Sequence, residues 1–236
     1  MGGQSFIDWL ADFFVPVHRE GHALVGLAAL ATLGLFFLWS PAGWLGALIT
    51  FLIAYAFRDP DRVVPLREGL VLAPADGRVA AIERHTPPAE AGLGSVERTR
   101  LSIALSPLDV PIARAPLAGS LGRALYVPGR FSSPLSDRAG EENERRISVI
   151  RTPAGTELGL VQIAGPASRR VVAFCEEGQS LGAGERIGLG PFGSRVDLYL
   201  PPGREVLVAI GQRLIAGETV VADLASDEPE RLARKV

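Results

Sequence analysis

The longest hydrophobic segment of the chain, residues 23–57, contains no charged residue and no histidine. A single helix over this segment would extend about 52 Å at 1.5 Å per residue, well beyond the roughly 30 Å of a bilayer's hydrocarbon core. Ser40-Pro41 interrupts the segment near its middle, and proline breaks or kinks the interior of a helix. The pattern therefore predicts two apolar helices, residues 23–39 and 42–57, which form a membrane-associating hairpin within residues 1–57.

The charges that flank this segment predict its orientation. Arg19 precedes it and Arg58 and Arg62 follow it, and basic residues favour the cytoplasmic side of a membrane. Both ends of the hairpin, and the rest of the chain, are therefore expected on the cytoplasmic side of the cell membrane. Asp8 and Asp12 stand where a signal peptide has its basic leader, which argues against a secretion signal. A buried core hairpin of a soluble protein is the alternative, although the segment has no polar face.

Beyond Arg58 the pattern changes to short runs of β-branched and other apolar residues, separated by Gly and Pro. Such runs predict strands, and no segment has the convincing long apolar period of an amphipathic helix. Residues 58–236 are therefore predicted to form a mostly β domain. The candidate strands are residues 70–72, 79–83, 100–105, 124–127, 147–151, 158–163, 170–174, 196–200, 206–210 and 219–222.

Two internal repeats refine the predicted fold. Residues 178–185 and 211–218 share the pattern Gly-Gln-x-Leu-x-Ala-Gly-Glu, and residues 73–79 are echoed by residues 115–121. Each unit predicts a strand, a glycine-containing turn and a second strand. Repeated hairpins of this kind resemble the barrel-sandwich architecture of lipoyl and biotinyl domains, in which a sheet folds over itself and closes its edges. The Gly-Gln segments are then structural turns and not phosphate cradles, since neither opens a helix.

The charge balance and the few chemistry-bearing residues exclude several functions. With 24 basic and 26 acidic residues the net charge is −2, so the chain has no basic field for nucleic acid. The single cysteine, Cys175, rules out an internal disulfide and lies in an apolar run, which favours a small buried side chain over a reactive thiol. His18 and His22 have helical spacing without a third ligand nearby, and His85 stands alone. We therefore expect neither nucleic acid nor a metal as a partner.

Gly193-Ser194 is the motif with the most specific chemistry. Glycine leaves its carbonyl group unhindered, and the hydroxyl of the following serine can attack that carbonyl and exchange the amide for an ester. Gly-Ser alone is an ordinary turn dipeptide, so only its surroundings can distinguish a reactive bond from a turn. Here it lies within Phe192-Gly193-Ser194-Arg195-Val196-Asp197 and introduces the β-like run of residues 196–200.

This hexapeptide is similar to the self-cleavage site of the short bacterial phosphatidylserine decarboxylases, which are pyruvoyl enzymes made as one-chain proenzymes. Four further segments resemble that family in the same order along the chain. They are residues 57–62, residues 73–78, residues 140–145, and residues 161–165 with Arg169-Arg170. The resemblance runs from about Val15 to Leu224, which is nearly the whole chain.

The resemblance implies a membrane enzyme that converts phosphatidylserine into phosphatidylethanolamine in phospholipid biosynthesis. Self-cleavage between Gly193 and Ser194 would produce chains 1–193 and 194–236, which stay together as a heterodimer. Ser194 would become a covalent pyruvoyl cofactor, which forms a Schiff base with the substrate's amine and withdraws the electrons left when CO2 departs. Asp76 corresponds to a family aspartate that assists the serine, whereas Ala-Asp-Gly in isolation is more typical of a turn.

Two positions depart from the family pattern. Short members usually carry Asp-Val-His-Val-Asn-Arg, and Pro111 stands here in the place of the histidine that assists cleavage. Arg146 stands where the family commonly has asparagine. His85 is an alternative histidine, although Arg84 and Thr86-Pro87-Pro88 around it are typical of an exposed loop. Because a proline can neither take nor donate a proton, we expect self-cleavage to be slow.

Two other functions fit parts of the sequence. One is a non-catalytic relative that keeps the fold and binds lipid, and the other is a membrane-anchored barrel-sandwich adaptor or carrier. A carrier needs a modifiable lysine in a hairpin, and the single lysine is Lys235, close to the last residue. A plain adaptor would not need Gly193-Ser194 in this setting, so the decarboxylase is the preferred interpretation.

Overall fold

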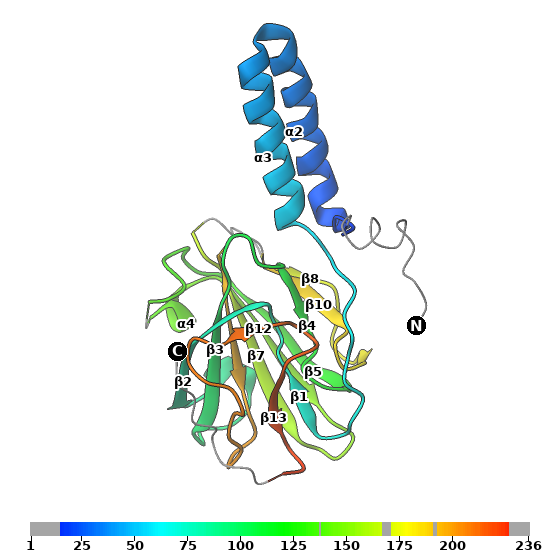
Figure 1. Ribbon diagram of the computed structural model, residues 1–236. Coiled ribbons are helices and arrows are strands. Elements are labelled where there is room, and N and C mark those ends of the chain that lie inside the picture. Colours follow the sequence, from blue (N-terminus) through cyan, green and yellow to red (C-terminus); the bar gives the residue numbers. More distant parts are fainter. Residues whose placement is uncertain (1–14, 137, 167–170, 191–192, 227–236) are drawn as a thin grey trace, which may run out of the picture. The chain divides into compact units, whose positions relative to one another are not determined.

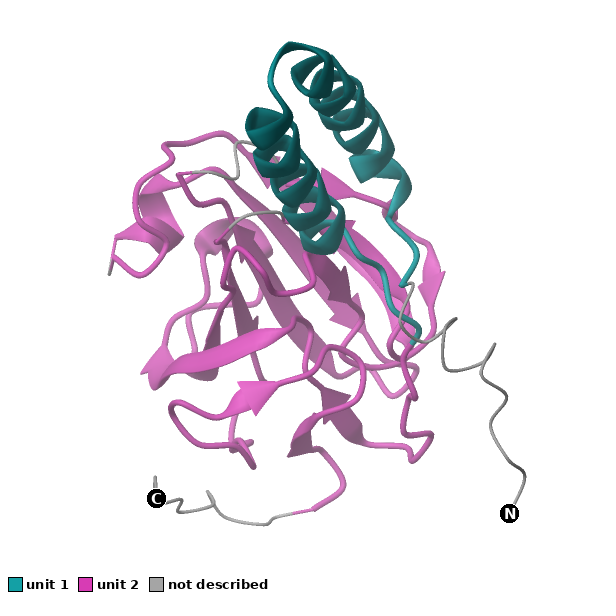
Figure 2. Cartoon of the chain, turned by 45° about the horizontal axis from the view of Figure 1, so that its top comes forward, with its two compact units in different colours: residues 1–61 teal, residues 62–236 magenta. Residues whose placement is uncertain are grey.

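The computed structural model describes residues 15–136, 138–166, 171–190 and 193–226. The chain divides into two compact units, residues 1–61 and residues 62–236 (Figure 2). The first unit contains a pair of helices and the second is built mostly of strands (Figure 1). The predicted fold class, a mostly β domain preceded by an apolar helical hairpin, is confirmed.

The helical unit consists of α2 (Arg19–Leu38) and α3 (Ser40–Ala56). Trp39 alone separates the two helices, and its extended backbone ends α2 and precedes α3. Pro41 lies in the first turn of α3, where its missing N–H and fixed φ are tolerated. The predicted break of the apolar segment is therefore confirmed, although the proline starts the second helix and does not end the first.

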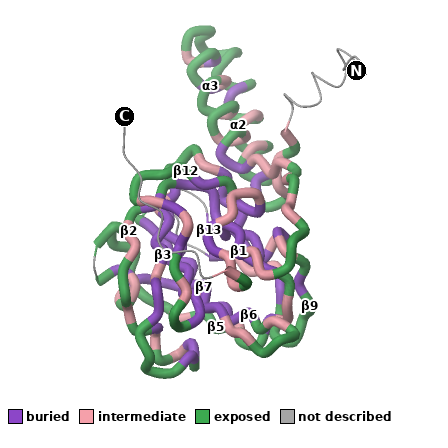
Figure 3. Tube along the Cα trace, turned by 60° about the horizontal axis from the view of Figure 1, so that its bottom comes forward, coloured by how far each residue is buried: buried purple, intermediate pink, exposed green. Residues whose placement is uncertain are grey.

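Small residues allow α2 and α3 to pack closely against each other. A Cβ atom at Gly43 would come within 2.3 Å of the ring of Phe36, so the backbone of α3 lies directly on that ring. The hydroxyls of Thr32 and Thr50 hydrogen-bond between the helices at 2.9 Å. Most large apolar side chains of the pair are exposed (Figure 3). By length and composition α2 could cross a membrane, and an exposed apolar surface of this kind is consistent with membrane association.

The β-domain contains thirteen strands within the described ranges. Their bounds are β1 Leu70–Leu72, β2 Gly77–His85, β3 Arg98–Ala104, β4 Ile112–Arg114, β5 Gly119–Val127, β6 Arg145–Arg151, β7 Glu157–Ile163, β8 Val172–Ala173, β9 Ser180–Leu181, β10 Arg186–Leu189, β11 Arg195–Tyr199, β12 Arg213–Leu214 and β13 Val220–Asp223. A 3-10 turn, η1 (Ala89–Ala91), precedes β3, and a short helix, α4 (Ala139–Glu142), precedes β6.

Eight strands form one curled antiparallel sheet in the order β12-β2-β3-β11-β7-β6-β5-β9. Outside this sheet, β1 pairs with β13, and β10 lies between β4 and β8. The arrangement has two corresponding halves that meet between β11 and β7. The first half is β1, β2, β3, β11, β12 and β13, and the second is β4, β5, β6, β7, β9 and β10. The second half is continuous in sequence, whereas the first is completed by β11, β12 and β13 after the second half has ended.

The two halves use the sequence repeats at corresponding places. β12 pairs with β2 as β9 pairs with β5. The N–H of Gly211 donates to the carbonyl oxygen of Val79 at 2.8 Å, and that of Gly178 donates to Leu121 at 2.7 Å. These two glycines have φ values of +85° and +84°, which favour glycine because it lacks a Cβ atom. The repeated segments are structural turns, as predicted.

Some strands differ from the prediction. Residues 206–210 form no strand, because their backbone enters the turn in which Gln212 N–H donates to Ala209. Val206 and Val208 are nevertheless both buried, and this alternation explains the strand-like pattern. β4, β9, β10 and β12 were not among the candidate strands. Of the strand predicted over residues 170–174, only the two residues of β8 form a strand. Arg170 lies outside the described residues.

The middle of the large sheet is buried on both faces, so its central strand has no exposed side. Leu160 and Leu198 belong to the main hydrophobic core on one face, and Ile147 and Tyr199 belong to a smaller cluster on the other. All residues of β11 are consequently buried, including the charged ones. Buried residues concentrate in the strands (Figure 3). The sheet thus holds the start of β11, where the predicted site lies, inside the protein.

Candidate active site

Ser194 directly precedes β11, which pairs with β3 on one side and β7 on the other. Ser194 is only 3% exposed, and its Oγ donates a hydrogen bond to the carbonyl oxygen of Gly190 at 2.9 Å. Its own carbonyl oxygen accepts from the N–H of Leu105 at 3.0 Å. The sheet therefore fixes the backbone of this serine, and the segment that follows β10 holds its hydroxyl.

The chain contains three Gly-Ser bonds, and their surroundings differ. Ser95 is exposed, and Ser120 is half-buried with its hydroxyl 3.5 Å from a backbone carbonyl oxygen. Gly94 and Gly193 have similar φ values, +79° and +71°, so backbone conformation does not separate their bonds. Burial and a fixed hydroxyl distinguish Gly193-Ser194 from the other two.

The carbonyl group that Ser194 would attack belongs to Gly193 and packs against Gly165. A Cβ atom at Gly165 would lie 2.0 Å from the Gly193 carbonyl oxygen, a distance that no side chain tolerates. Pro134 lies on the same side, with its Cγ 3.5 Å from that Cβ position. Gly193 itself needs the left-handed φ that other residues rarely adopt. Both glycines are therefore required to place the scissile carbonyl.

Ser194 lines a small pocket formed by β4, β7, β11 and the segments beside them. Its walls lie so close together that the pocket has no room for a water molecule. The described residues that line it are Ala75, Leu105, Pro111, Ala113, Gln162, Ile163, Val171, Gly190, Ser194 and Val196. Apart from Ser194 and Gln162, these residues have no polar side chain, so the surroundings of Ser194 are apolar.

Asp76, the other predicted catalytic side chain, lies beside this pocket and not in its lining. Its neighbour Ala75 lines the pocket, but its carboxylate is occupied elsewhere. Oδ2 accepts from Nη2 of Arg62 at 2.7 Å, and Oδ1 accepts from the N–H of Ala216 at 2.8 Å. The side chains of this ion pair are only 11% and 10% exposed. Both carboxylate oxygens are therefore bound by groups other than the Ser194 hydroxyl.

Pro111, which replaces the family histidine, lines the same pocket as Ser194. Its carbonyl oxygen accepts from the N–H of Gly190 at 2.9 Å. His85 is far from this place, since it ends β2 beside Tyr199, with 6.4 Å between the ring centroids. Tyr199 lies about 16 Å along β11 from Ser194 at roughly 3.3 Å per residue. His85 therefore cannot replace the missing histidine, and it belongs to a strand and not to the predicted loop.

The other two histidines have partners near the start of α2. Nδ1 of His18 accepts from the N–H of Glu20 at 3.3 Å, and Nε2 of His22 lies 2.9 Å from the carbonyl oxygen of Val17. Among the described residues, no group of three or more His, Cys, Asp or Glu side chains is arranged to hold a metal ion.

Arg146, the second departure from the family pattern, lies on β6 directly opposite Gln162 of β7. It donates to the carbonyl oxygen of Cys175 at 3.1 Å, and burial lowers the pKa of its guanidinium group. Cys175 is itself buried, and burial raises the pKa of its thiol. Its thiol lies 3.5 Å from the carbonyl oxygen of Arg186. Cys175 is thus a small core side chain, as predicted.

Two buried polar residues that the sequence analysis did not single out hold the segment around Pro134. Nδ2 of Asn143 donates to the carbonyl oxygens of Ser132 at 2.8 Å and Ala164 at 2.9 Å. Nη1 of Arg195 donates to the carbonyl oxygen of Pro134 at 2.8 Å. Both residues lie in segments that resemble the family, and this resemblance could have indicated them in the sequence. Their hydrogen-bond partners are distant in sequence, so the contacts themselves could not be predicted.

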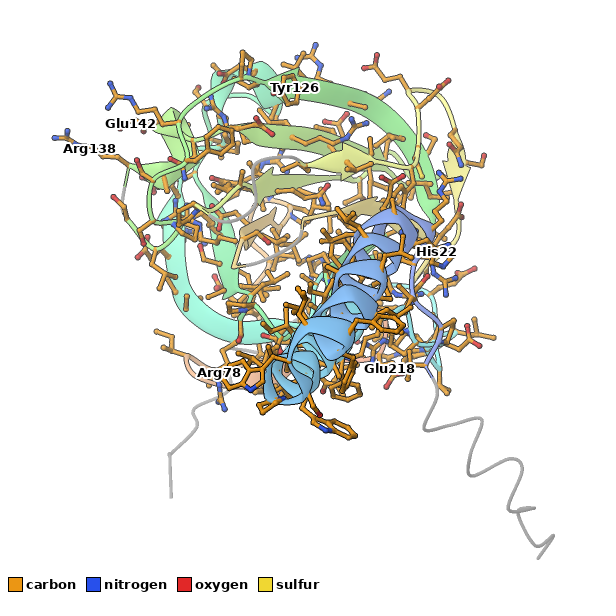
Figure 4. All side chains as sticks on the ribbon, turned by 90° about the horizontal axis from the view of Figure 1, so that it is seen from above. His22, Arg78, Tyr126, Arg138, Glu142 and Glu218 are labelled. Atoms are coloured by element: carbon orange, nitrogen blue, oxygen red, sulfur yellow. The ribbon has the colours of Figure 1, made fainter. Side chains whose placement is uncertain are left out.

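The short helix α4 lies next to this segment and has a polar outer side. Arg138 and Glu142 point away from the domain (Figure 4) and approach each other to 4.0 Å. An exposed pair of this kind contributes little to stability. Ala139 is buried, and a Cβ atom at Gly140 would lie 3.2 Å from Nη2 of Arg195. Helix α4 therefore covers Arg195, the residue that follows Ser194.

Comparisons with known proteins agree with these features. The family model described as phosphatidylserine decarboxylase matches residues 49–222. A phosphatidylserine decarboxylase proenzyme of Cereibacter sphaeroides is 47% identical over 225 residues, which are 95% of this chain and 97% of the relative. A protein of the same name from Nitrobacter winogradskyi is 50% identical over 208 residues, which are 88% of this chain and 84% of the relative. The resemblance found in the sequence is thereby confirmed, and the chain belongs to the phosphatidylserine decarboxylase family.

Proposed function

We propose that this chain is the proenzyme of a membrane phosphatidylserine decarboxylase, which converts phosphatidylserine into phosphatidylethanolamine. The observation that carries the proposal is the Gly193-Ser194 bond, whose buried serine has its hydroxyl held in an apolar pocket at the start of the central strand. Membership of the family supports the substrate and the reaction. The name proenzyme, which both relatives carry, supports processing of the chain.

The proposed self-cleavage uses only groups of the chain and one water molecule. The Ser194 hydroxyl attacks the Gly193 carbonyl carbon and converts the peptide bond into an ester, with the proton passing to the freed amine. Elimination then releases Gly193 as a carboxylate and leaves a dehydroalanine at position 194. Water hydrolyses its imine tautomer to a ketone and releases ammonia. The products are chains 1–193 and 194–236.

The surroundings of Ser194 fit a pyruvoyl group. A ketone is neutral and small, and the pocket walls around it are apolar apart from Gln162. When it is present, the pyruvoyl group supplies a carbonyl that binds the substrate's amine and withdraws the electrons left when CO2 departs. The apolar walls exclude water from the substrate's carboxylate, and this favours its loss as neutral CO2.

Cleavage would also create space for the substrate. In the uncut chain the pocket has no room for a water molecule, and the Gly193 carbonyl is held against Gly165. Once the bond to Ser194 is broken, Gly193 is a chain end and can move away from the pocket. We infer that the proenzyme cannot bind the substrate's head group and that the two-chain form can.

The chain of residues 194–236 should stay bound after the cut. It contributes β11 between β3 and β7, β12 beside β2, and β13 beside β1. Arg213 of this chain also pairs with Asp109 at 3.1 Å. Removing it would leave the edges of β3 and β7 unpaired in the interior, which is unfavourable. The mature enzyme is therefore a heterodimer of its own products.

Asp76 is proposed to assist cleavage by positioning its surroundings. Its carboxylate joins Arg62 to Ala216, which lie on the two future chains, and Ala75 beside it forms part of the pocket wall. With Pro111 at the pocket wall in place of histidine, no described residue that lines the pocket can act as a general base for the serine. Loss of such a base typically slows proton transfer about 10²–10⁴-fold, so a time course of intact mass should show slow maturation. One slow turnover per molecule still produces mature enzyme.

The membrane location is proposed from two apolar features. One is the exposed apolar surface of α2 and α3, and the other is the pair of exposed side chains Leu108 and Leu135, which follow Pro107 and Pro134 in the chain. We place both ends of the helical hairpin and the β-domain on the cytoplasmic side. Reporter fusions at the N-terminus and after Arg62 should then both report the cytoplasm, and opposite sides would contradict the hairpin.

Three Gly-Ser bonds in one chain provide a matched test. Intact mass should show wild-type protein cut between Gly193 and Ser194, with a ketone in place of the Ser194 amine. Ser194→Ala should remain one chain and release no CO2 from phosphatidylserine. Ser95→Ala and Ser120→Ala should be cut and active like the wild type, because those bonds lie outside the buried pocket.

Two outcomes would contradict the proposal in different ways. A cut at the same bond in Ser194→Ala would exclude chemistry driven by the serine hydroxyl. Complete cleavage of the wild type without any CO2 release would reject the decarboxylase and favour the lipid-binding relative.

A further inference from the structure

Gln162 is the one polar side chain that shares the pocket lining with Ser194 among the described residues. Gln162 is 3% exposed, and its Oε1 is buried without a hydrogen-bond partner in the described part of the chain. A buried, unpaired polar atom is unfavourable, whereas an apolar side chain of similar size would avoid this cost. The amide is therefore unexplained by packing alone.

The sheet places Gln162 on the same face as Ser194. Gln162 of β7 is directly opposite Val196 of β11, and residues that face each other across an antiparallel pair share a face. Ser194 precedes Val196 by two positions and so points to that face as well. The two residues are diagonal neighbours on adjacent strands, a separation that a long side chain spans.

Gly188 of β10 packs against the side-chain amide of Gln162 and restricts its position. A Cβ atom at Gly188 would lie 3.1 Å from Oε1 and 3.2 Å from Nε2 of Gln162, so the flat amide rests on the glycine backbone. The unpaired end is the oxygen Oε1, which can only accept a hydrogen bond. The side chain is thus held in the pocket wall with an amide end free to bind a ligand.

We propose that Gln162 binds the amino-acid head of the substrate in the mature enzyme, with Oε1 accepting a hydrogen bond from its amino group. This inference rests on the proposed function. An unpaired acceptor in an otherwise apolar pocket favours a head group with N–H donors. Gln162 therefore orients the amine at residue 194 and leaves the carboxylate against apolar walls.

The test compares Gln162→Leu with a matched change in an exposed turn, Gln179→Leu. Intact mass should show that both variants are cut like the wild type. KM for phosphatidylserine in mixed micelles should rise about tenfold in Gln162→Leu with kcat little changed, since the lost hydrogen bond holds both the ground state and the transition state. Gln179→Leu should keep both constants.

Binding of the product gives a readout that does not depend on turnover. Calorimetry on the mature protein should show phosphatidylethanolamine bound about tenfold more weakly by Gln162→Leu. Phosphatidylcholine, whose nitrogen has no N–H, should bind the variant and the wild type equally. Gln162→Met, with a similar length and no amide, should repeat both results and exclude a packing defect peculiar to leucine.

Several results would overturn the inference. Equal phosphatidylethanolamine affinities in wild type and Gln162→Leu would remove Gln162 from substrate binding. Failure of both Gln162 variants to self-cleave, with unchanged melting temperatures, would assign the side chain to maturation. If the mature wild type releases no CO2, the proposed function fails, while the comparison of the two lipids still decides whether Gln162 binds an amine.

Discussion

The two halves of the β-domain make the same turn with different side chains. In the second half the turn that begins at Ala115-Pro116 contains Ala118, and in the first half the turn at Ala73-Pro74 has Asp76 at that position. The backbone hydrogen bonds correspond: Leu72 donates to Pro116 as Arg114 donates to Pro74, at 2.7 and 2.8 Å. The turn therefore forms without a carboxylate.

This difference changes the interpretation of Asp76. In the sequence alone, Ala-Asp-Gly is most simply explained as a turn, but Ala118 makes the corresponding turn and is exposed. Asp76 is buried, with Arg62 and the N–H of Ala216 on its two oxygens. The two copies of the repeat therefore distinguish the turn, which the fold requires in both halves, from the Asp76 carboxylate, which is present in the first half alone.

The halves also differ in how the chain passes through them. The second half runs without interruption from β4 to β10, whereas the first half is completed only by β11, β12 and β13. The Gly193-Ser194 bond lies at the junction where the chain returns to the first half. A cut at this junction breaks no strand, so every strand pair can persist in the two-chain form.

The largest expected effect comes from giving the first half the residue of the second, Asp76→Ala. This change leaves the Arg62 guanidinium buried without its carboxylate, which destabilises a protein by about 3–5 kcal/mol. The melting temperature should fall by roughly 10 °C, measured in the uncut Ser194→Ala background so that cleavage does not interfere. In the cleavable background the same change should slow self-cleavage.

The matched control removes both charges. Arg62→Leu combined with Asp76→Ala replaces the ion pair by apolar groups, which often restores stability. The double variant should melt within a few degrees of the parent, above Asp76→Ala alone. A double variant as unstable as the sum of the two single variants would show that the ion pair is not what distinguishes the halves.

Much of the fold could be predicted because its signals are local. The charge-free segment, Pro41, the alternating strands and the two Gly-Gln repeats all lie within short stretches of sequence. The pairing of β11 with β7, which joins the halves, depends on contacts between distant residues. Residues 206–210 show where local patterns fail to predict structure. Val206 and Val208 are buried and Leu207 between them is not, as in a strand, but this segment forms no strand.

The candidate site likewise has one part that local sequence indicates and another that depends on contacts between distant residues. The proposal for Gly193-Ser194 rests on the chemistry of two adjacent residues, so the sequence alone was sufficient to make it. Gly165 and Gln162 belong to a segment that resembles the family, but nothing local shows that one meets the Gly193 carbonyl and the other lines the Ser194 pocket. These relations arise only when β7 and β11 pair, and sequence patterns do not specify that pairing.

The smallest expected effects come from the glutamines of the two repeats, Gln179→Ala and Gln212→Ala. Oε1 of Gln179 accepts from Glu176 N–H at 3.3 Å, and Oε1 of Gln212 accepts from Ala209 N–H at 3.1 Å. In the uncut chain each change should lower stability by about 1 kcal/mol, as expected for one exposed hydrogen bond. Thermal melts of the two variants should therefore coincide to within a few degrees.

After self-cleavage, the two variants should differ in how firmly they retain the small chain. Gln179 would lie in the proposed chain 1–193, where its turn is anchored by the bond from Gly178 to Leu121. Gln212 would lie in the proposed chain 194–236, and its turn would hold that chain to β2 through the bond from Val79 to Gln212. In the mature enzyme, Gln212→Ala should speed dissociation of the small chain in dilute denaturant, measured by size exclusion, while Gln179→Ala should not. Equal dissociation would mean that β11 alone retains the small chain and that the repeats serve only the uncut fold.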